Sequence, residues 1–211
     1  MPSLLQLDSS ADLQHSTSRA LTEHFADAWR DRGAEYTVVR RDLHRDPLPH
    51  LPTNALHWAP RLRLAGEVAD PRAEELQQAL IAEAMAADTI VIGAPMYQWT
   101  VPSTLKAWLD YLHVPGVTAP YDEPTLPLAG KPVVVVCSRG DRYGPGTPGA
   151  GLDFVTPVLN QVLGAALGMR VTFVVAELTL AQRIPAMGEF VAEQQAGLAR
   201  ARAELEALAN R

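Results

Sequence analysis

The chain has 211 residues, of which 47% are hydrophobic and 20% are charged, and its formal net charge at pH 7 is −6. This composition fits one domain over residues 1–211 with a large core. The net negative charge excludes a protein that binds the phosphates of nucleic acids. No apolar run approaches the ~20 residues that span a bilayer, so we expect a cytoplasmic protein with neither nucleic-acid nor membrane partners.

Five short apolar segments predict β-strands along the chain. They cover residues 3–7, 35–41, 88–94, 131–137 and 169–176. Segments 88–94 and 131–137 are apolar on both faces, which is typical of strands buried in a parallel sheet between two helical layers. Segment 35–41 alternates polar and apolar residues, as an outer strand of such a sheet does.

Segments with the apolar spacing of helices lie between and after these strands. They cover residues 18–32, 71–87, 102–112, 155–167 and 185–209. Alternation of strands and helices implies right-handed crossovers and an α/β doubly wound parallel sheet with helices on both faces. Five strands and five helices fit the flavodoxin-like order 2-1-3-4-5 better than a six-stranded dinucleotide-binding fold.

Two long proline-rich stretches, residues 42–70 and 114–130, carry no regular pattern. Long loops of a compact domain are usually lids or walls of a binding site. Their aromatic and leucine content favours packed walls over disordered insertions.

The single cysteine, Cys137, excludes an intramolecular disulfide and a thiol-rich metal site, and we expect no bound metal. Cys137 follows four valines in a predicted strand. We therefore interpret it as a small buried hydrophobe and not as a nucleophile.

Ligands of an open α/β sheet bind beyond the carboxyl ends of the strands. After the first strand, five hydroxyl side chains precede or open the first helix: Ser9, Ser10, Ser16, Thr17 and Ser18. Hydroxyls and the free N–H groups of a helix start favour a phosphate monoester. The simpler alternative is an N-cap, which needs only one of these residues. The segment has neither GxGxxG nor GxxxxGK[ST], so a nicotinamide Rossmann site and a P-loop are disfavoured.

The ends of the third and fourth strands carry two further groups. Met96, Tyr97 and Trp99 lie in a turn between prolines, where they suit a flat conjugated ligand; a hydrophobic turn packed on a neighbour is the alternative. After the fourth strand comes a glycine-rich loop with Arg139 and Arg142. Each of the two arginines could bind an anion, or it could simply be solvated.

Together these segments resemble the FMN-dependent NADH:quinone oxidoreductases, the bacterial azoreductases. The resemblance runs nearly end to end. It rests on residues 5–18, on Ala94-Pro95-Met96-Tyr97 leading into Ser103-Thr104-Leu105-Lys106, on Gly116-Val117-Thr118, on Ser138-Arg139-Gly140, on Val155-Thr156-Pro157 and on Phe173-Val174-Val175-Ala176-Glu177.

This resemblance implies a homodimer that binds FMN. The enzyme would take hydride from NADH or NADPH and then pass it to a quinone or azo acceptor, in a ping-pong mechanism. No catalytic side chain is expected, since the flavin carries the chemistry. The resemblance also implies which residues bind FMN. The FMN phosphate would be bound by Ser9, Ser16, Thr17 and Ser18, and the isoalloxazine ring by Pro95, Met96, Tyr97, Gln98 and Trp99. The edge of the ring would contact Ser138, Arg139, Gly140, Asp141 and Tyr143, and the substrate pocket would be lined by Trp99 and Tyr121.

The chain departs from the family pattern at three of these positions. Gln98 and Trp99 replace a common Asn and Phe, and Asp141 replaces a second glycine. A carboxylate beside the flavin would lower its potential, unless Asp141 points to solvent.

Two other functions stay open from the sequence. One is a tailoring reductase for a single quinonoid or heteroaromatic metabolite. The other is a flavodoxin-type electron carrier, against which the two long loops argue.

Overall fold

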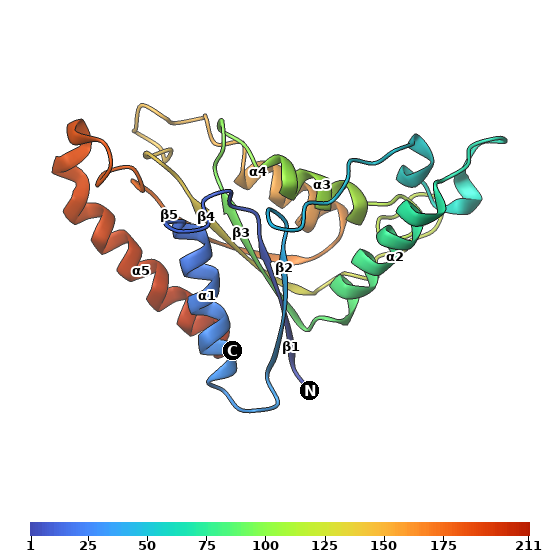
Figure 1. Ribbon diagram of the computed structural model, residues 1–211, viewed down its shortest axis with the longest axis horizontal. Helices are drawn as coiled ribbons and strands as arrows, with labels where there is room; N and C mark the ends of the chain where they lie inside the picture. Colours follow the sequence, from blue (N-terminus) through green and yellow to red (C-terminus); the bar gives the residue numbers. More distant parts are fainter.

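A computed structural model describes all residues, 1–211, as one α/β domain (Figure 1). The five strands form one parallel sheet in the order β2-β1-β3-β4-β5, which confirms the predicted order. Their bounds are Ser3–Asp8 for β1, Thr37–Asp42 for β2, Thr89–Pro95 for β3, Pro132–Ser138 for β4 and Arg170–Ala176 for β5. The predicted strands thus end within one residue of the observed ones.

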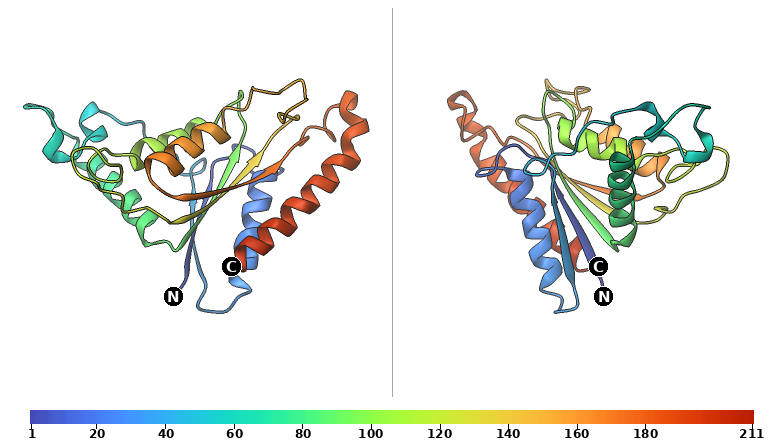
Figure 2. Two further views of the ribbon diagram at one scale, coloured as in Figure 1. Left: turned by 180° about the vertical axis from the view of Figure 1, so that it is seen from behind. Right: turned by 45° about the vertical axis from the view of Figure 1, so that its right-hand side comes forward.

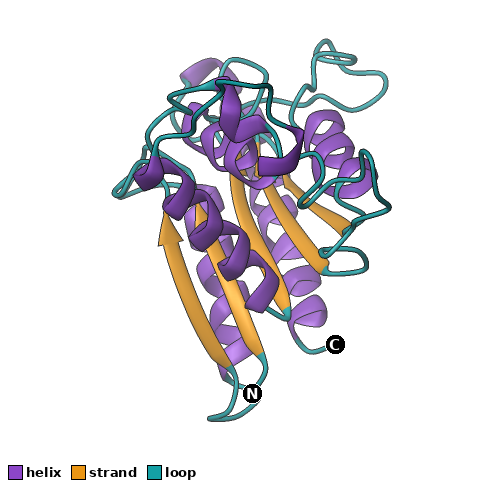
Figure 3. Ribbon diagram, turned by 90° about the vertical axis from the view of Figure 1, so that its right-hand side faces the viewer, coloured by secondary structure: helices purple, strands orange, loops and turns teal.

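Helices cover both faces of the sheet (Figures 1 and 2). One layer consists of α1 and α5, and the other contains α2, α3 and α4. The bounds are Thr17–Arg30 for α1, Pro71–Ala86 for α2, Ser103–Leu112 for α3, Thr156–Leu159 for α4 and Val191–Ala209 for α5. Figure 3 shows the strands from the side of α2, with the loops gathered beyond their carboxyl ends.

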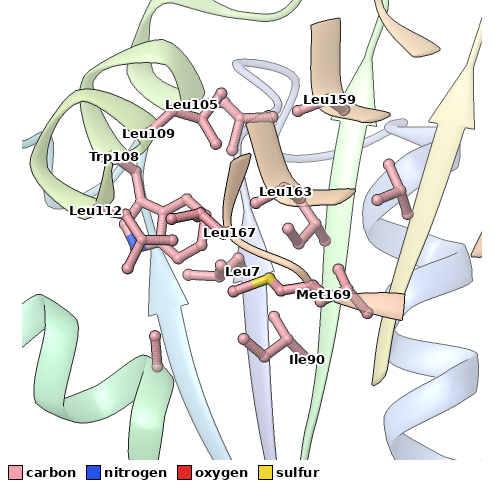
Figure 4. Packing of buried hydrophobic residues seen from close by; sticks show 14 of the residues in the cluster. Leu7, Ile90, Leu105, Trp108, Leu109, Leu112, Leu159, Leu163, Leu167 and Met169 are labelled. Atoms are coloured by element: carbon pink, nitrogen blue, oxygen red, sulfur yellow. The ribbon is translucent and has the colours of Figure 1, made fainter. Parts of the chain in front are cut away.

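The largest of the three core clusters lies between the sheet and the layer of α2, α3 and α4. It contains 27 buried residues, against 14 in the cluster beneath α1 and α5. Figure 4 shows leucines and Trp108 of this cluster packed over strand residues such as Leu7 and Ile90. Because apolar groups cover both faces, the central strands are almost continuously hydrophobic.

No helix is both long enough and apolar enough to cross a membrane.

Two predicted helices differ from the structure. Residues 155–167 form only a short α-helix, α4, which continues as a π-helix over Asn160–Ala166. The wider turn keeps Leu159, Leu163 and Leu167 on one buried face against the sheet (Figure 4). The last helix begins at Val191, because Pro185–Phe190 forms a 3-10 helix before it.

The proline-rich stretch 42–70 is packed, as predicted. Leu43 and Leu56 are completely buried, and two short 3-10 helices, Asn54–His57 and Pro60–Leu62, give the stretch local order. Arg61 links it to the second stretch through two hydrogen bonds to Asp122, of 3.0 and 2.8 Å. The two stretches therefore form one wall next to α3.

Candidate functional site

A cavity of about 910 Å³ lies at the carboxyl edge of the sheet. It is lined by the loop before α1, the ends of β3 and β4, the segment after β5 and the first turns of α5. The lining residues that the sequence singled out are Ser10, Ser16, Thr17, Pro95, Met96, Tyr97, Ser138 and Gly140. This is the edge at which ligands of doubly wound sheets bind.

The loop between β1 and α1 is ordered by its own side chains. Asp12 accepts hydrogen bonds from the backbone N–H groups of Gln14 and His15, at 3.0 and 2.8 Å. Ser16 caps α1, because its Oγ accepts a hydrogen bond from the N–H of Arg19 at 3.3 Å. The N-cap that the sequence offered as the simpler alternative is thus present, at Ser16.

Capping leaves the start of α1 with unused donors. The backbone N–H groups of Ser16, Thr17 and Ser18 donate to no acceptor in the protein. These are the donors that a helix start leaves free, and the helix dipole adds a partial positive charge there. A dianionic phosphate accepts from such donors and needs none of its own, so the donor set fits a phosphate monoester.

The other hydroxyls assigned to the phosphate lie deeper. Ser9 is buried, and its Oγ donates to the carbonyl of Gly93 at 2.6 Å. Ser18 is buried too, with its Oγ 3.1 Å from that of Ser16. Neither lines the cavity, so Ser9 fixes the loop to β3 and Ser18 orients the hydroxyl of Ser16.

Arg19, in the first turn of α1, also holds the loop. Its guanidinium donates to the carbonyl of Ser10 at 3.1 and 2.7 Å, and to the carboxylate of Asp42 at 2.6 and 2.8 Å. Burial raises the pKa of Asp42, but hydrogen bonds from Arg19 and from the N–H groups of Arg45 and His44 outweigh it and lower the pKa to about 2. Asp42 is therefore ionised at neutral pH.

The end of β3 folds into a tight reverse turn. Tyr97 and Thr100 exchange two backbone hydrogen bonds, and the two central residues, Gln98 and Trp99, have φ of +44° and +65°. Both values lie in the left-handed region, which favours Asn and Gly. The turn presents Trp99 outward with 52% of its surface exposed, so packing of Trp99 in the core is excluded.

The loop after β4 is held by a buried arginine. Arg139 is 6% exposed and donates to Asp153 at 2.7 Å and to Glu177 at 3.5 Å, so the expectation of a solvated arginine is wrong for this residue. Its Nε has no partner. The neighbouring Gly140 packs closely on Leu180, and a Cβ there would lie 2.7 Å from Cδ1 of Leu180, so that this leucine side chain would have to move.

The remaining predicted residues lie outside the cavity lining. Asp141 is exposed, and its carboxylate accepts a hydrogen bond from the N–H of Arg142 at 2.7 Å. Tyr143 donates its backbone N–H to Glu177 at 3.0 Å. Tyr121 is 66% exposed and packs edge-on against Trp58, with ring centroids 5.2 Å apart. The interpretation of Cys137 is confirmed: it is completely buried, and burial raises its pKa to about 12.

The cavity also contains residues that the sequence did not indicate. They are Asp12, His15, Thr179, Leu180, Gln182, Arg183, Gln194 and Leu198. Six of the eight follow β5 or lie on α5. Thr179 and Leu180 reach the site because their N–H groups donate to the carbonyls of Arg139 and Gly140 in the loop after β4, at 3.0 and 3.3 Å. The sequence carries no local signal for them, because the polar residues after β5 stand among apolar ones in an irregular segment.

Comparisons with known proteins give concordant results. The family described as "Flavodoxin-like fold" matches residues 2–208. A protein of Kineococcus radiotolerans named FMN-dependent NADH:quinone oxidoreductase is 55% identical over 208 residues, covering 96% of this chain and 97% of its own. One of the same name from Streptomyces avermitilis is 41% identical over 214 residues, covering 99% and 96%. The crystal structure of an azoreductase from Bacillus anthracis has the same fold, with a TM-score of 0.81, 21% identity and coverage of 100% and 99%.

Proposed function

Because this chain belongs to the FMN-dependent NADH:quinone oxidoreductases, we propose that its cavity binds FMN and that it transfers reducing equivalents from NADH to a quinone. The free N–H groups of Ser16, Thr17 and Ser18 at the start of α1, where Ser16 and Thr17 line the cavity, carry this proposal. They match the terminal phosphate of FMN, which riboflavin lacks.

The residues that would hold FMN divide by the part of the cofactor they meet. The α1 start, with the hydroxyls of Ser16 and Thr17, takes the phosphate; the turn after β3 and the loop after β4 take the ring. When bound, FMN supplies the two-electron hydride chemistry, and no side chain has to act as acid or base. The task of the protein is to hold the ring in place and to exclude competing partners.

The walls of the substrate slot come from aromatic rings, of which Trp99 and Tyr121 are exposed and Tyr97 is half-buried. We assign them to Tyr97, Trp99 and Tyr121, whose flat faces admit one conjugated partner at a time. NADH and the acceptor then use the same slot in succession, which is a ping-pong order. Azo compounds are a second acceptor class with the same flat geometry.

We also propose that the protein is a cytoplasmic homodimer, and exposed apolar side chains support the dimer. Trp99 and Phe154 are 52% and 53% exposed, and the N–H of Phe154 donates to the carbonyl of Trp99 at 3.0 Å. Two such rings next to a binding cavity suit a contact with a second copy, which would place Tyr121 of one protomer over the site of the other. Light scattering tests this, and full quinone reductase activity from a monomer contradicts it.

Steady-state turnover tests the function itself. FMN-loaded protein should oxidise excess NADH continuously when a small p-benzoquinone is present. An electron carrier lacks a nicotinamide site, so it would accept no hydride from NADH and show no turnover. A tailoring reductase would turn over its own metabolite but reduce simple benzoquinones poorly.

A further inference from the structure

A second cavity, of about 490 Å³, lies at the amino ends of the strands. It is lined by Thr89, Pro132 and Arg170, which are the first residues of β3, β4 and β5. Trp29, in the last turn of α1, and Leu208, in the last turn of α5, line it from the helical side. No residue lines both this cavity and the one at the carboxyl edge, so the two are separate sites.

Aromatic rings form one wall of this second cavity. Phe25, Trp29 and Tyr36 all line it; the first two are buried and Tyr36 is half-buried. The rings of Trp29 and Tyr36 meet edge-on, with centroids 5.4 Å apart. Val134 and Leu208 add aliphatic surface. A cavity of this size with an aromatic wall suits a small organic molecule better than a bare ion.

The charge of the second cavity is positive. Arg32, Arg170 and Arg211 line it, and no acidic side chain does. None of the three arginines forms a salt bridge, which requires a carboxylate oxygen within 4.0 Å. The chain as a whole has a net charge of −6, so this is a local reversal of sign. Cations that no carboxylate neutralises attract an anion.

Arg32 is held in place but keeps donors free. Its guanidinium carbon lies 4.3 Å from the ring centroid of Tyr36 and 5.1 Å from that of Trp29. Its Nη1 donates to the carbonyl of Ala209 at 2.7 Å, at the end of α5. Its Nε and Nη2 donate to no acceptor in the protein. A planar guanidinium that is already fixed binds a carboxylate through two hydrogen bonds with little further loss of entropy.

Arg170 approaches the same cavity from the sheet. Side chains alternate along a strand, so Arg170 points to the same face of β5 as Thr172, which lines the cavity, and Val174, which is buried beneath α1 and α5. Its Nε donates to the carbonyl of Gly130 at 2.8 Å. The two terminal nitrogens of this guanidinium have no partner in the protein and remain available to an anion.

We propose that the second cavity binds a small aromatic carboxylate, whose carboxylate is held by Arg32 and Arg170 and whose ring lies against the apolar wall. Both parts of the ligand follow from the cavity. A neutral aromatic molecule would leave the arginines without an anion, and an inorganic anion would leave the apolar wall in contact with water. Because the cavity lies at the end of the sheet opposite the flavin site, this inference does not depend on the proposed function.

Three probes separate the two parts of the site. Naphthoate has ring and charge, naphthamide has the ring without the charge, and acetate has the charge without the ring. Their Kd values are measured by isothermal titration calorimetry with the full chain in the presence of saturating FMN. The variants are Arg32→Gln and Arg170→Gln. Arg202→Gln is the matched control, because Arg202 is exposed on α5, has no carboxylate partner and lies outside the cavity.

The wild type should bind naphthoate at least about 10-fold more tightly than naphthamide or acetate. Arg32→Gln and Arg170→Gln should each raise the Kd of naphthoate by about 10-fold, since hydrogen bonds between ions are about twice as strong as neutral ones. Both variants should leave the Kd of naphthamide unchanged, and Arg202→Gln should leave all three values unchanged. Arg170 is exposed, so Arg170→Gln should keep the wild-type melting temperature even if Arg32→Gln does not.

Three outcomes overturn the proposal. If naphthamide binds as tightly as naphthoate, the site does not recognise an anion. If Arg170→Gln leaves the Kd of naphthoate unchanged, or if a benzoquinone displaces naphthoate, the probe lies in the cavity at the carboxyl edge. If the wild type does not bind naphthoate, the arginines serve only the ends of α1 and α5. Failure of the proposed function is a different result, namely no turnover of NADH with a quinone.

Discussion

The hydroxyl of Tyr97 lies 2.9 Å from the backbone N–H of Ala11 and accepts its hydrogen bond. It is also 3.3 Å from Oγ of Ser10. One phenol thus ties the turn after β3 to the loop before α1, and Arg19 holds the carbonyl of the same Ser10–Ala11 peptide unit from the other side. The two halves of the cofactor site are therefore positioned together.

Removing the hydroxyl of Tyr97 should weaken the binding of FMN. We expect Tyr97→Phe to raise the Kd for FMN by about 5- to 10-fold, since a lost neutral hydrogen bond costs about 1 kcal/mol. Flavin fluorescence titration measures the change. Tyr36→Phe, at the opposite end of the sheet, serves as the control. An unchanged Kd for Tyr97→Phe would show that the loop is ordered without the hydroxyl.

Acid should weaken the pair of Arg19 and Asp42. The folded-state pKa of Asp42, about 2, lies below its ordinary 3.8. Its stabilisation is therefore present above pH ~4 and is lost as the pH falls towards 2. After screening by solvent we expect about 1 kcal/mol.

This contribution is measured by urea unfolding of the wild type and Asp42→Asn across the acid range. The variant should be less stable by about 1 kcal/mol at pH 7, and the difference should shrink between pH 4 and pH 2. If the difference in stability between the two proteins does not depend on pH, the ion pair of Arg19 and Asp42 is not its cause.

Trp99 should control which acceptors enter. Its exposed indole fills more volume than the phenylalanine common in the family, so bulky azo dyes should be poorer substrates than flat quinones. Trp99→Phe should raise kcat/KM for an azo dye relative to a small quinone by about 10-fold, if ~1.4 kcal/mol of steric discrimination is relieved.

The melting temperature provides the second readout for Trp99. Since Trp99 is half exposed, Trp99→Phe should change stability by no more than about 0.5 kcal/mol. Trp29→Phe is the matched control, because Trp29 lies in α1 and is only 5% exposed. This substitution should lower the melting temperature without affecting the acceptor ratio. An unchanged acceptor ratio for Trp99→Phe would contradict the assigned role.

The sequence predicted the sheet well because its central strands are apolar on both faces, a pattern with few alternatives. It failed where structure depends on distant partners. The burial of Arg139 requires Asp153 and Glu177, which lie 14 and 38 residues further along the chain. Gln194 gave no signal either, because it is one of several polar residues in α5, and the sequence alone does not show which of them are buried.

Some predicted site residues were placed near the cavity but not in it. Ser9 and Ser18 are hydroxyls within the correct segment, yet both point into the protein. The sequence identifies a cluster of hydroxyls but not their directions, because side-chain direction depends on backbone angles at each residue of the loop. Trp99 points outward for the same reason, since its left-handed φ reverses the chain.

Comparison of FMN with riboflavin tests the central claim, that the start of α1 binds a cofactor phosphate. The two Kd values are measured for the wild type, for the double variant Ser16→Ala/Thr17→Ala, and for Ser103→Ala, which removes an exposed hydroxyl at the start of α3. The wild type and Ser103→Ala should prefer FMN. The double variant should lose at least about 10-fold more affinity for FMN than for riboflavin, since hydrogen bonds to a charged phosphate are worth more than neutral ones. Equal losses for both flavins, or a wild type that binds riboflavin as tightly as FMN, would contradict it.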